Sequence, residues 1–321
     1  MNCTVLNVVV ARKKREAIDI TSFELANEDG RPLPSFAAGA HIDVHLPGGV
    51  VRQYSLCNDP SETHRYLIAV LRDASGRGGS KAIHDLVHEG DRLQVSTPRN
   101  HFVLADHAPH HLLLAGGIGV TPILCMAERL VATGQPFDMH YCTRSADRTA
   151  FAKRITEACF SGSVRFHHDD NATGPTFDLS STLARAPGGT HLYVCGPRGF
   201  MDAVLAEARS KGWPEDRLHY EFFGAIPGQT AGDKNFQVRI ASSGATVEVA
   251  ADCTVVQALA AHGIEVLTSC EQGVCGTCLT RVIDGEPDHR DSYLTSDEQA
   301  ANDQFLPCCS RSKSELLVLD L

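Results

Sequence analysis

The chain has 321 residues, a formal net charge of −10, 43% hydrophobic residues and 21% charged residues. This length exceeds what one compact core usually holds, so we expect two or three domains. The acidic balance argues against nucleic acid as the main partner, because phosphate binding needs clustered lysine and arginine. No apolar run reaches the roughly 18 residues of a membrane span. Because no signal-peptide pattern opens the chain either, we expect a cytoplasmic protein.

Residues 1–105 are expected to form the first domain. Short β-rich runs separated by turn residues are typical of an antiparallel sandwich or barrel. These runs are 5–10, 41–46, 51–56, 66–71 and 92–96. Two stretches carry groups that suit a phosphorylated ring cofactor. They are Arg52, Tyr54 and Ser55 in one strand and Gly78, Gly79 and Ser80 in a later loop. A plain β-hairpin with a glycine loop would have the same pattern.

Residues 106–228 alternate strand-like and helix-like runs, which indicates a parallel α/β sheet. The strands are expected at 111–115, 137–141 and 191–195, and the helices at 123–132, 150–159 and 200–209.

Two turns follow strands of this expected sheet. The first contains Gly116, Gly117, Gly119 and Thr121, and the second contains Cys195, Gly196 and Pro197. Glycine turns that lead into helices suit a nucleotide, because the helix N-terminus favours negative charge and open α/β sheets bind ligands at strand ends. The pattern is not the G-x-G-x-x-G fingerprint. The candidates for positioning the reactive ring of the bound nucleotide are Thr121, Cys195 and Glu221. Cys195 could instead be only a buried residue at the end of a strand, and Glu221 only an acceptor of a structural hydrogen bond.

Residues 225–233 are rich in glycine and proline and indicate a linker. The last block, 229–321, holds strand-like runs at 236–241 and 246–249, a helix-like run at 255–262, and then the strongest signal of the chain.

That signal is a cysteine pattern, Cys270-x4-Cys275-x2-Cys278-x29-Cys308. This is the plant-type spacing of a [2Fe–2S] cluster. The loop must turn tightly around the cluster, and glycines at 273 and 276 permit the backbone angles that this needs. Structural zinc sites usually use two close cysteine pairs, whereas only one is present here. Spacing alone leaves open whether Cys308 or Cys309 is the fourth ligand.

The order of these signals resembles, along the whole chain, the phthalate dioxygenase reductase and vanillate demethylase reductase family. These proteins are the reductase components of two-component Rieske oxygenases. The resemblance implies an antiparallel flavin β-barrel, a ferredoxin-reductase-like α/β NAD domain and a C-terminal plant-type ferredoxin with an α+β β-grasp fold. It also implies FMN rather than FAD, electron transfer from NADH through the flavin and the cluster to a Rieske-type oxygenase, and a monomer.

The resemblance extends to individual site residues. It implies that Arg52, Tyr54, Ser55 and the Gly78–Ser80 loop hold the flavin, and that the two glycine turns hold NADH. The stretch 219–223 resembles a family motif whose last aromatic lies against the flavin, which implies this role for Phe223; Tyr220 departs from the usual Phe. Because relatives have Ser-Arg shortly after the fourth ligand, Cys308 is implied as the ligand and Cys309 as a packing residue.

The choice of NADH over NADPH rests on charge. Arg144 is the only basic residue directly after the second strand of the α/β region until Arg148, whereas Asp169 and Asp170 follow the third. These carboxylates suit a free ribose hydroxyl and would repel a 2′-phosphate. Two other functions remain open from the sequence: a reductase for another acceptor, such as a cytochrome-type hydroxylase, and a redox-sensing protein.

Overall fold

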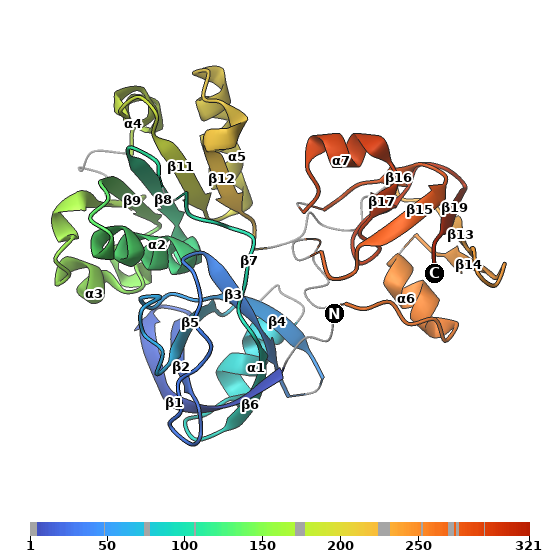
Figure 1. The fold of residues 1–321 in the computed structure, drawn as a ribbon, viewed down its shortest axis with the longest axis horizontal. Helices are drawn as coiled ribbons and strands as arrows, with labels where there is room; N and C mark the ends of the chain where they lie inside the picture. The colour runs from blue at the N-terminus through green and yellow to red at the C-terminus, as the bar shows by residue number, and fades with distance from the viewer. Residues whose placement is uncertain are drawn as a thin grey trace. The chain divides into compact units, whose positions relative to one another are not determined.

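A computed structural model gives the fold of the chain (Figure 1). It describes residues 5–47, 49–73, 78–105, 107–170, 177–223, 232–251, 253–268, 273, 276–291 and 293–321. The chain forms two compact units, Met1–Glu221 and Phe222–Leu321, and each is described here by itself. Within the described residues, none of the helices has both the length and the apolar character needed to cross a membrane.

The first half of the N-terminal unit is an antiparallel barrel. Its strands are β1 (Val5–Ala17), β2 (Ile20–Ala26), β3 (Ala40–His45), β4 (Val51–Ser55), β5 (Tyr66–Leu71), β6 (Arg92–Ser96) and β7 (Arg99–Asn100). The order is β4-β3-β6-β1-β2-β5, with β7 paired to β3. A bridge between Leu56 and Ile68 connects the two outer strands, which closes the sheet. The expected antiparallel barrel is confirmed, and helix α1 (Gly79–Leu86) accompanies it.

The barrel core follows the alternation of its strands. Phe23, Leu25, Ile42 and Val44 are fully buried in the barrel core, whereas Asp43, between the last two, is buried in an ion pair with Arg99. Strand β1 runs to Ala17, well past the expected end at residue 10. Its basic second half pairs with β2 and has one face outside the barrel, so charged side chains are tolerated there.

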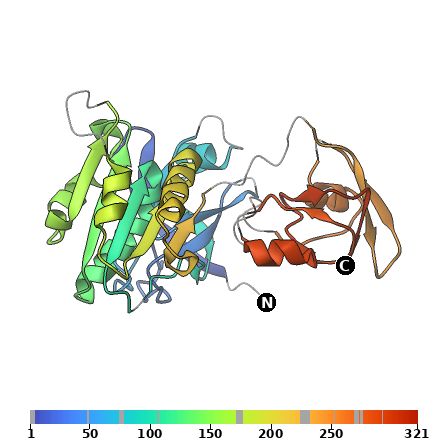
Figure 2. The same cartoon turned by 90° about the horizontal axis from the view of Figure 1, so that it is seen from above.

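The second half of the N-terminal unit is a parallel α/β sheet, as expected (Figure 2). Its strands are β8 (His111–Gly116), β9 (Phe137–Thr143), β10 (Val164–His168), β11 (His191–Cys195) and β12 (Leu218–Glu221). The order is β10-β9-β8-β11-β12, so β8, which is buried along its whole length, lies at the centre. The described helices are α2 (Val120–Ala132), α3 (Ala152–Thr156), α4 (Leu179–Arg185) and α5 (Arg198–Ser210), with 3-10 turns η1 (Gly117–Gly119), η2 (Ala146–Arg148), η3 (Ser161–Ser163) and η4 (Glu215–Arg217).

The C-terminal unit is a small mixed sheet with helices. Its main sheet has the order β14-β13-β19-β15-β17, with β13 (Phe236–Ile240), β14 (Thr246–Val249), β15 (Thr280–Asp284), β17 (Gln304–Phe305) and β19 (Leu316–Leu319). A second pair joins β16 (Pro287–Asp288) to β18 (Arg311–Ser312). Helices α6 (Val255–Ala261) and α7 (Ser296–Ala301) both begin with a capping box.

A buried ion-pair network holds the beginning of this unit. The Asp233 carboxylate accepts two hydrogen bonds from the Arg290 guanidinium, at 2.9 and 2.6 Å. The buried Arg311 guanidinium lies 3.7 Å from the same carboxylate and donates to the Cys253 carbonyl at 2.7 Å. Asp233, expected at the end of the linker 225–233, is therefore fixed to the folded unit. Residues 224–231 lie outside the described part of the chain.

Candidate functional site

Arg52 and the glycine loop lie together, although 26 residues separate them in the sequence. A Cβ atom placed on Gly79 would lie 2.6 Å from Arg52 Nε, so the guanidinium stem rests directly on the Gly79 backbone. Helix α1 begins at Gly79, and Gly78 before it has a left-handed φ of 85°. No described side chain caps this helix start. Its free N–H groups and the adjacent guanidinium therefore fit the phosphate of a flavin mononucleotide.

Tyr54 and Ser55 end strand β4, where the barrel meets the α/β sheet. Tyr54 packs partly buried against the barrel core, and burial raises the pKa of its hydroxyl above the ordinary value. The Ser55 hydroxyl donates a hydrogen bond of 3.0 Å to Glu221 Oε2, although 166 residues separate the two. This contact joins the expected flavin strand to the carboxyl end of β12. The expected flavin and nicotinamide residues thus meet at one place.

The two glycine turns of the α/β sheet are also in contact. Strands β8 and β11 are parallel neighbours, so the turns that follow them lie side by side. A Cβ on Gly196 would come within 2.9 Å of the Gly116 backbone, and one on Gly119 would overlap the Cys195 carbonyl oxygen. The Thr121 hydroxyl, at the start of α2, donates to the Ile118 carbonyl at 3.1 Å. The close approach requires glycine and leaves backbone N–H groups at the carboxyl edge of the sheet.

Cys195 and Glu221 end neighbouring strands in register. Cys195 is fully buried, and burial, reinforced by the Glu221 carboxylate, raises the pKa of its thiol well above the usual value. Burial also raises the pKa of Glu221 to about 7, although the hydrogen bond from Ser55 opposes this shift. Glu221 can therefore hold a proton near neutral pH, whereas the Cys195 thiol stays neutral.

Arg144 and the two aspartates lie at the same edge of the sheet. Arg144 is exposed directly after β9, and its carbonyl accepts a 3.1 Å hydrogen bond from the Asp170 amide. The Asp169 amide donates to the Thr143 carbonyl at 3.1 Å, so both carboxylates follow the end of β10 beside Arg144. Phe223, two residues after β12, is 37% exposed; its role at the flavin stays a prediction.

The cysteine cluster is described in part. Cys278 and Cys308 are buried in one apolar cluster, while Cys270 and Cys275 lie outside the described residues. Gly273 and Gly276 both adopt the left-handed backbone expected from the sequence, with φ of 71° and 69°. A side chain at 273 would overlap Cys309 Sγ. This tight, glycine-dependent loop above buried thiols fits a [2Fe–2S] cluster.

Cys309 has partners of its own inside the protein. Its thiol lies 3.7 Å from the Leu306 carbonyl and 3.8 Å from the Ser310 hydroxyl. These contacts suit a packing role for Cys309, and Cys308 as the fourth ligand stays a prediction from the resemblance.

Sequence reasoning did not identify Asp291 as an organiser of the cluster loop. Its carboxylate accepts the amide of Leu294 at 2.8 Å and the hydroxyl of Ser310 at 3.4 Å, and its backbone lies against Gly273. Asp291 thereby connects the loop before the fourth ligand to the segment after it. Asp291 also accepts the backbone amide of Tyr293 at 3.2 Å, and this Asx turn is the kind of local structure that an aspartate in a loop can indicate.

Comparisons with known proteins place the chain in a family. Residues 238–313 match a 2Fe-2S iron-sulfur cluster binding domain, and residues 92–218 match the N-terminal domain of dimethylamine monooxygenase subunit DmmA-like proteins. A vanillate O-demethylase oxidoreductase from Pseudomonas sp. (strain HR199 / DSM 7063) is 53% identical, covering 98% of this chain and 100% of that protein.

Several solved structures match 99% of the chain, and two of them are described here. Phthalate dioxygenase reductase, described as a modular structure for electron transfer from pyridine nucleotides to [2Fe–2S], is 42% identical with a TM-score of 0.79, and 98% of it is matched. An intact type IV self-sufficient cytochrome P450 monooxygenase is 41% identical with a TM-score of 0.82, and 41% of that longer chain is matched. This chain is therefore an oxidoreductase that belongs to the family of vanillate O-demethylase oxidoreductase and phthalate dioxygenase reductase, the reductase components of oxygenase systems.

Proposed function

We propose that this chain is the NADH-dependent reductase component of a Rieske-type oxygenase, with FMN and one [2Fe–2S] cluster as its electron carriers. The observation that carries the proposal is the hydrogen bond from Ser55 to Glu221 at 3.0 Å. It joins the strand of the flavin residues to the edge of the sheet where the two nucleotide turns lie. A hydride donor and a flavin held by these residues would be neighbours.

Different residues would bind the flavin phosphate and contact the flavin ring. Arg52 and the start of α1, with Gly78, Gly79 and Ser80, would hold the FMN phosphate. Tyr54, Ser55 and Phe223 would contact the ring. Flavin accepts two electrons as a hydride and can release them singly, which suits a one-electron cluster.

The nicotinamide end is framed by Cys195, Thr121 and Glu221. The buried Cys195 thiol and the closely packed turns at Gly119 and Gly196 would form the protein surface against which the nicotinamide ring lies. Glu221, with a pKa of about 7, can hold or release a proton through Ser55 at the place where hydride is exchanged.

Charge supports NADH as the donor. Asp169 and Asp170 lie beside Arg144 at the end of the second and third strands of the sheet, and carboxylates there favour a free ribose over a 2′-phosphate. The monomeric state, the Rieske type of the partner and a cytoplasmic location stay predictions from the sequence.

A second acceptor class is favoured by one observation. A module 41% identical to the whole chain forms part of a self-sufficient cytochrome P450 monooxygenase. A cytochrome-type hydroxylase is therefore the alternative partner.

Stopped-flow kinetics with purified partners tests these proposals. We expect NADH to reduce the flavin at least tenfold faster than NADPH, and electrons to reach a Rieske oxygenase only when Cys308 is intact. Equal rates with NADH and NADPH would contradict the choice of NADH. Fast transfer to a P450 with none to a Rieske oxygenase would favour the alternative.

A further inference from the structure

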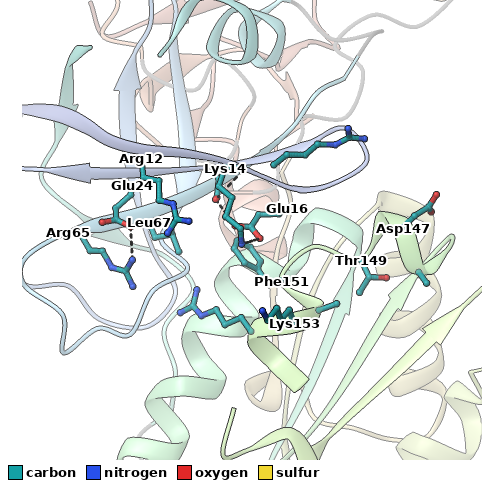
Figure 3. Close-up of a pocket in the computed structure, with 15 residues that line it drawn as sticks. Arg12, Lys14, Glu16, Glu24, Arg65, Leu67, Asp147, Thr149, Phe151 and Lys153 are labelled. Carbon is teal, nitrogen blue, oxygen red and sulfur yellow. Dashed lines mark hydrogen bonds and ion pairs between the residues drawn. The ribbon is translucent and has the colours of Figure 1, made fainter. Parts of the chain in front are cut away.

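A cleft of about 510 Å³ opens in the N-terminal unit between the barrel and the α/β sheet, away from the turns that frame the nucleotide (Figure 3). One wall comes from β1, β2 and β5, and the other from the segment 146–154 around η2 and α3. Arg12 and Lys14 extend from β1 toward the segment that carries Phe151 and Lys153 (Figure 3). The volume lies in the range of small-molecule sites.

Basic side chains dominate the lining. Six of them, against three acidic ones, face the cleft: Arg12, Lys14, Arg15, Arg65, Lys153 and Arg154. They come from both halves of the unit, and Lys14 is paired with Glu16 on its own strand at 2.9 Å. The barrel and the α/β sheet each contribute to one positive surface.

Some of these cations are held by ion pairs, one of them to an acidic residue that also lines the cleft. Glu24 holds Arg65 at 2.7 Å, and Glu128 holds Arg154 at 2.6 Å. Each pair occupies some N–H groups of the guanidinium and fixes the orientation of the others. Because the side chain is already held in place, little side-chain entropy is lost when a ligand binds.

Two of the lining arginines have N–H groups without a protein partner among the described residues, one of them buried and the other exposed. Arg154 Nη1 is buried and has no hydrogen-bond partner there. The exposed Arg12 side chain forms no hydrogen bond or ion pair with any described residue, so its guanidinium is available to a ligand. A buried donor without a partner costs free energy, and native structures usually satisfy it with water or a bound ion.

We propose that this cleft binds a small oxyanion with two or more negative charges, of the diphosphate or polycarboxylate class. Arg12 and Lys153 approach it from opposite walls and Arg154 also lines the cleft, while Leu67 and Phe151 provide apolar contact. A ligand there touches both halves of the unit and so stabilises their packing by mass action. The site is separate from the residues proposed for FMN and NADH, and it does not depend on the proposed function.

Calorimetric titration of the full-length holoenzyme with pyrophosphate, and separately with citrate, tests the proposal at low ionic strength. We expect saturable binding of one anion per chain, together with a rise in the melting temperature of the protein. The variant Arg12→Ala with Lys153→Ala should bind about tenfold more weakly, since two charge-assisted contacts are lost. Preference for pyrophosphate or for citrate would identify the phosphate or the carboxylate form of the ligand.

A charge-matched control is Arg185→Ala with Arg239→Ala, two exposed arginines that do not line the cleft. The control should bind both anions as the unmodified chain does. Reduction of the flavin by NADH should be unchanged in both double variants, which shows that they are folded. Absence of saturable binding, or an equal loss in the cleft variant and the control, would overturn the proposal.

Discussion

Replacing Glu221 by Gln should stabilise the N-terminal unit at alkaline pH. Glutamine has nearly the same shape as protonated glutamate and keeps an oxygen that can accept the Ser55 hydroxyl. It cannot ionise. The substitution therefore isolates the free-energy cost of placing a carboxylate at the junction between barrel and sheet.

The magnitude follows from the pKa of Glu221, which burial raises from 4.5 to about 7. Between these values the unfolded chain has lost the proton while the folded chain keeps it. The free energy of unfolding therefore falls as pH rises through this window, by at most about 3 kcal/mol. Above pH 7 the penalty is constant, and near pH 4.5 it vanishes.

Denaturant unfolding of the full chain, followed by flavin fluorescence, measures this difference. The Glu221→Gln variant should gain up to about 3 kcal/mol over the unmodified chain at pH 8 and less than about 1 kcal/mol at pH 5. Glu215→Gln is the control, because hydrogen bonding to Arg209 lowers the pKa of that exposed carboxyl; it should gain nothing at pH 8. An equal gain of the Glu221 variant at both pH values would refute the reasoning.

Three further predictions concern the cluster, the nucleotide turns and the partner. Cys308→Ser should abolish the visible absorption of the cluster while Cys309→Ser keeps it, and NADH should still reduce the flavin in both; the reverse spectra would exchange the two roles. Gly119→Ala should weaken NADH binding at least tenfold in flavin-reduction titrations, because a Cβ there overlaps a backbone carbonyl, whereas Gly199→Ala, with open space around it, should not. Residues 234–321 hold thirteen acidic and six basic residues, a net charge of −7. If this charge attracts the oxygenase, electron transfer to the oxygenase should slow as the salt concentration rises, while reduction of the flavin by NADH changes little. A transfer rate independent of salt would mean that the acidic residues serve only to keep the protein in solution.

Much of the fold could be predicted because its strands are regular. The strands expected at 66–71, 92–96, 191–195 and 246–249 coincide with β5, β6, β11 and β14, since alternation or continuous burial leaves a clear pattern. The helix expected at 150–159 is shorter, because Phe151 adopts a left-handed φ of 58° and α3 begins only at Ala152.

The site was predictable residue by residue, but its assembly was not. Motif spacing identified Ser55 and Glu221 separately, yet nothing local indicates that residues from two halves of the unit share a hydrogen bond. The same holds for the cleft, whose cations from β1 and α3 are ordinary surface residues in the sequence. Such features depend on long-range packing, which periodicity does not encode.

The ion-pair network around Asp233 decides where the iron–sulfur unit can be separated from the rest of the chain. An isolated domain that starts at residue 234 would leave the Arg290 and Arg311 guanidinium groups, both largely buried, without their shared carboxylate. Removing one partner of a buried charge pair costs several kcal/mol, on the order of 3–5. A boundary placed before residue 232 keeps the pair whole. The start of the unit is therefore defined by one carboxylate rather than by the glycine-rich stretch before it, and a transfer of the unit to another electron donor should keep that carboxylate.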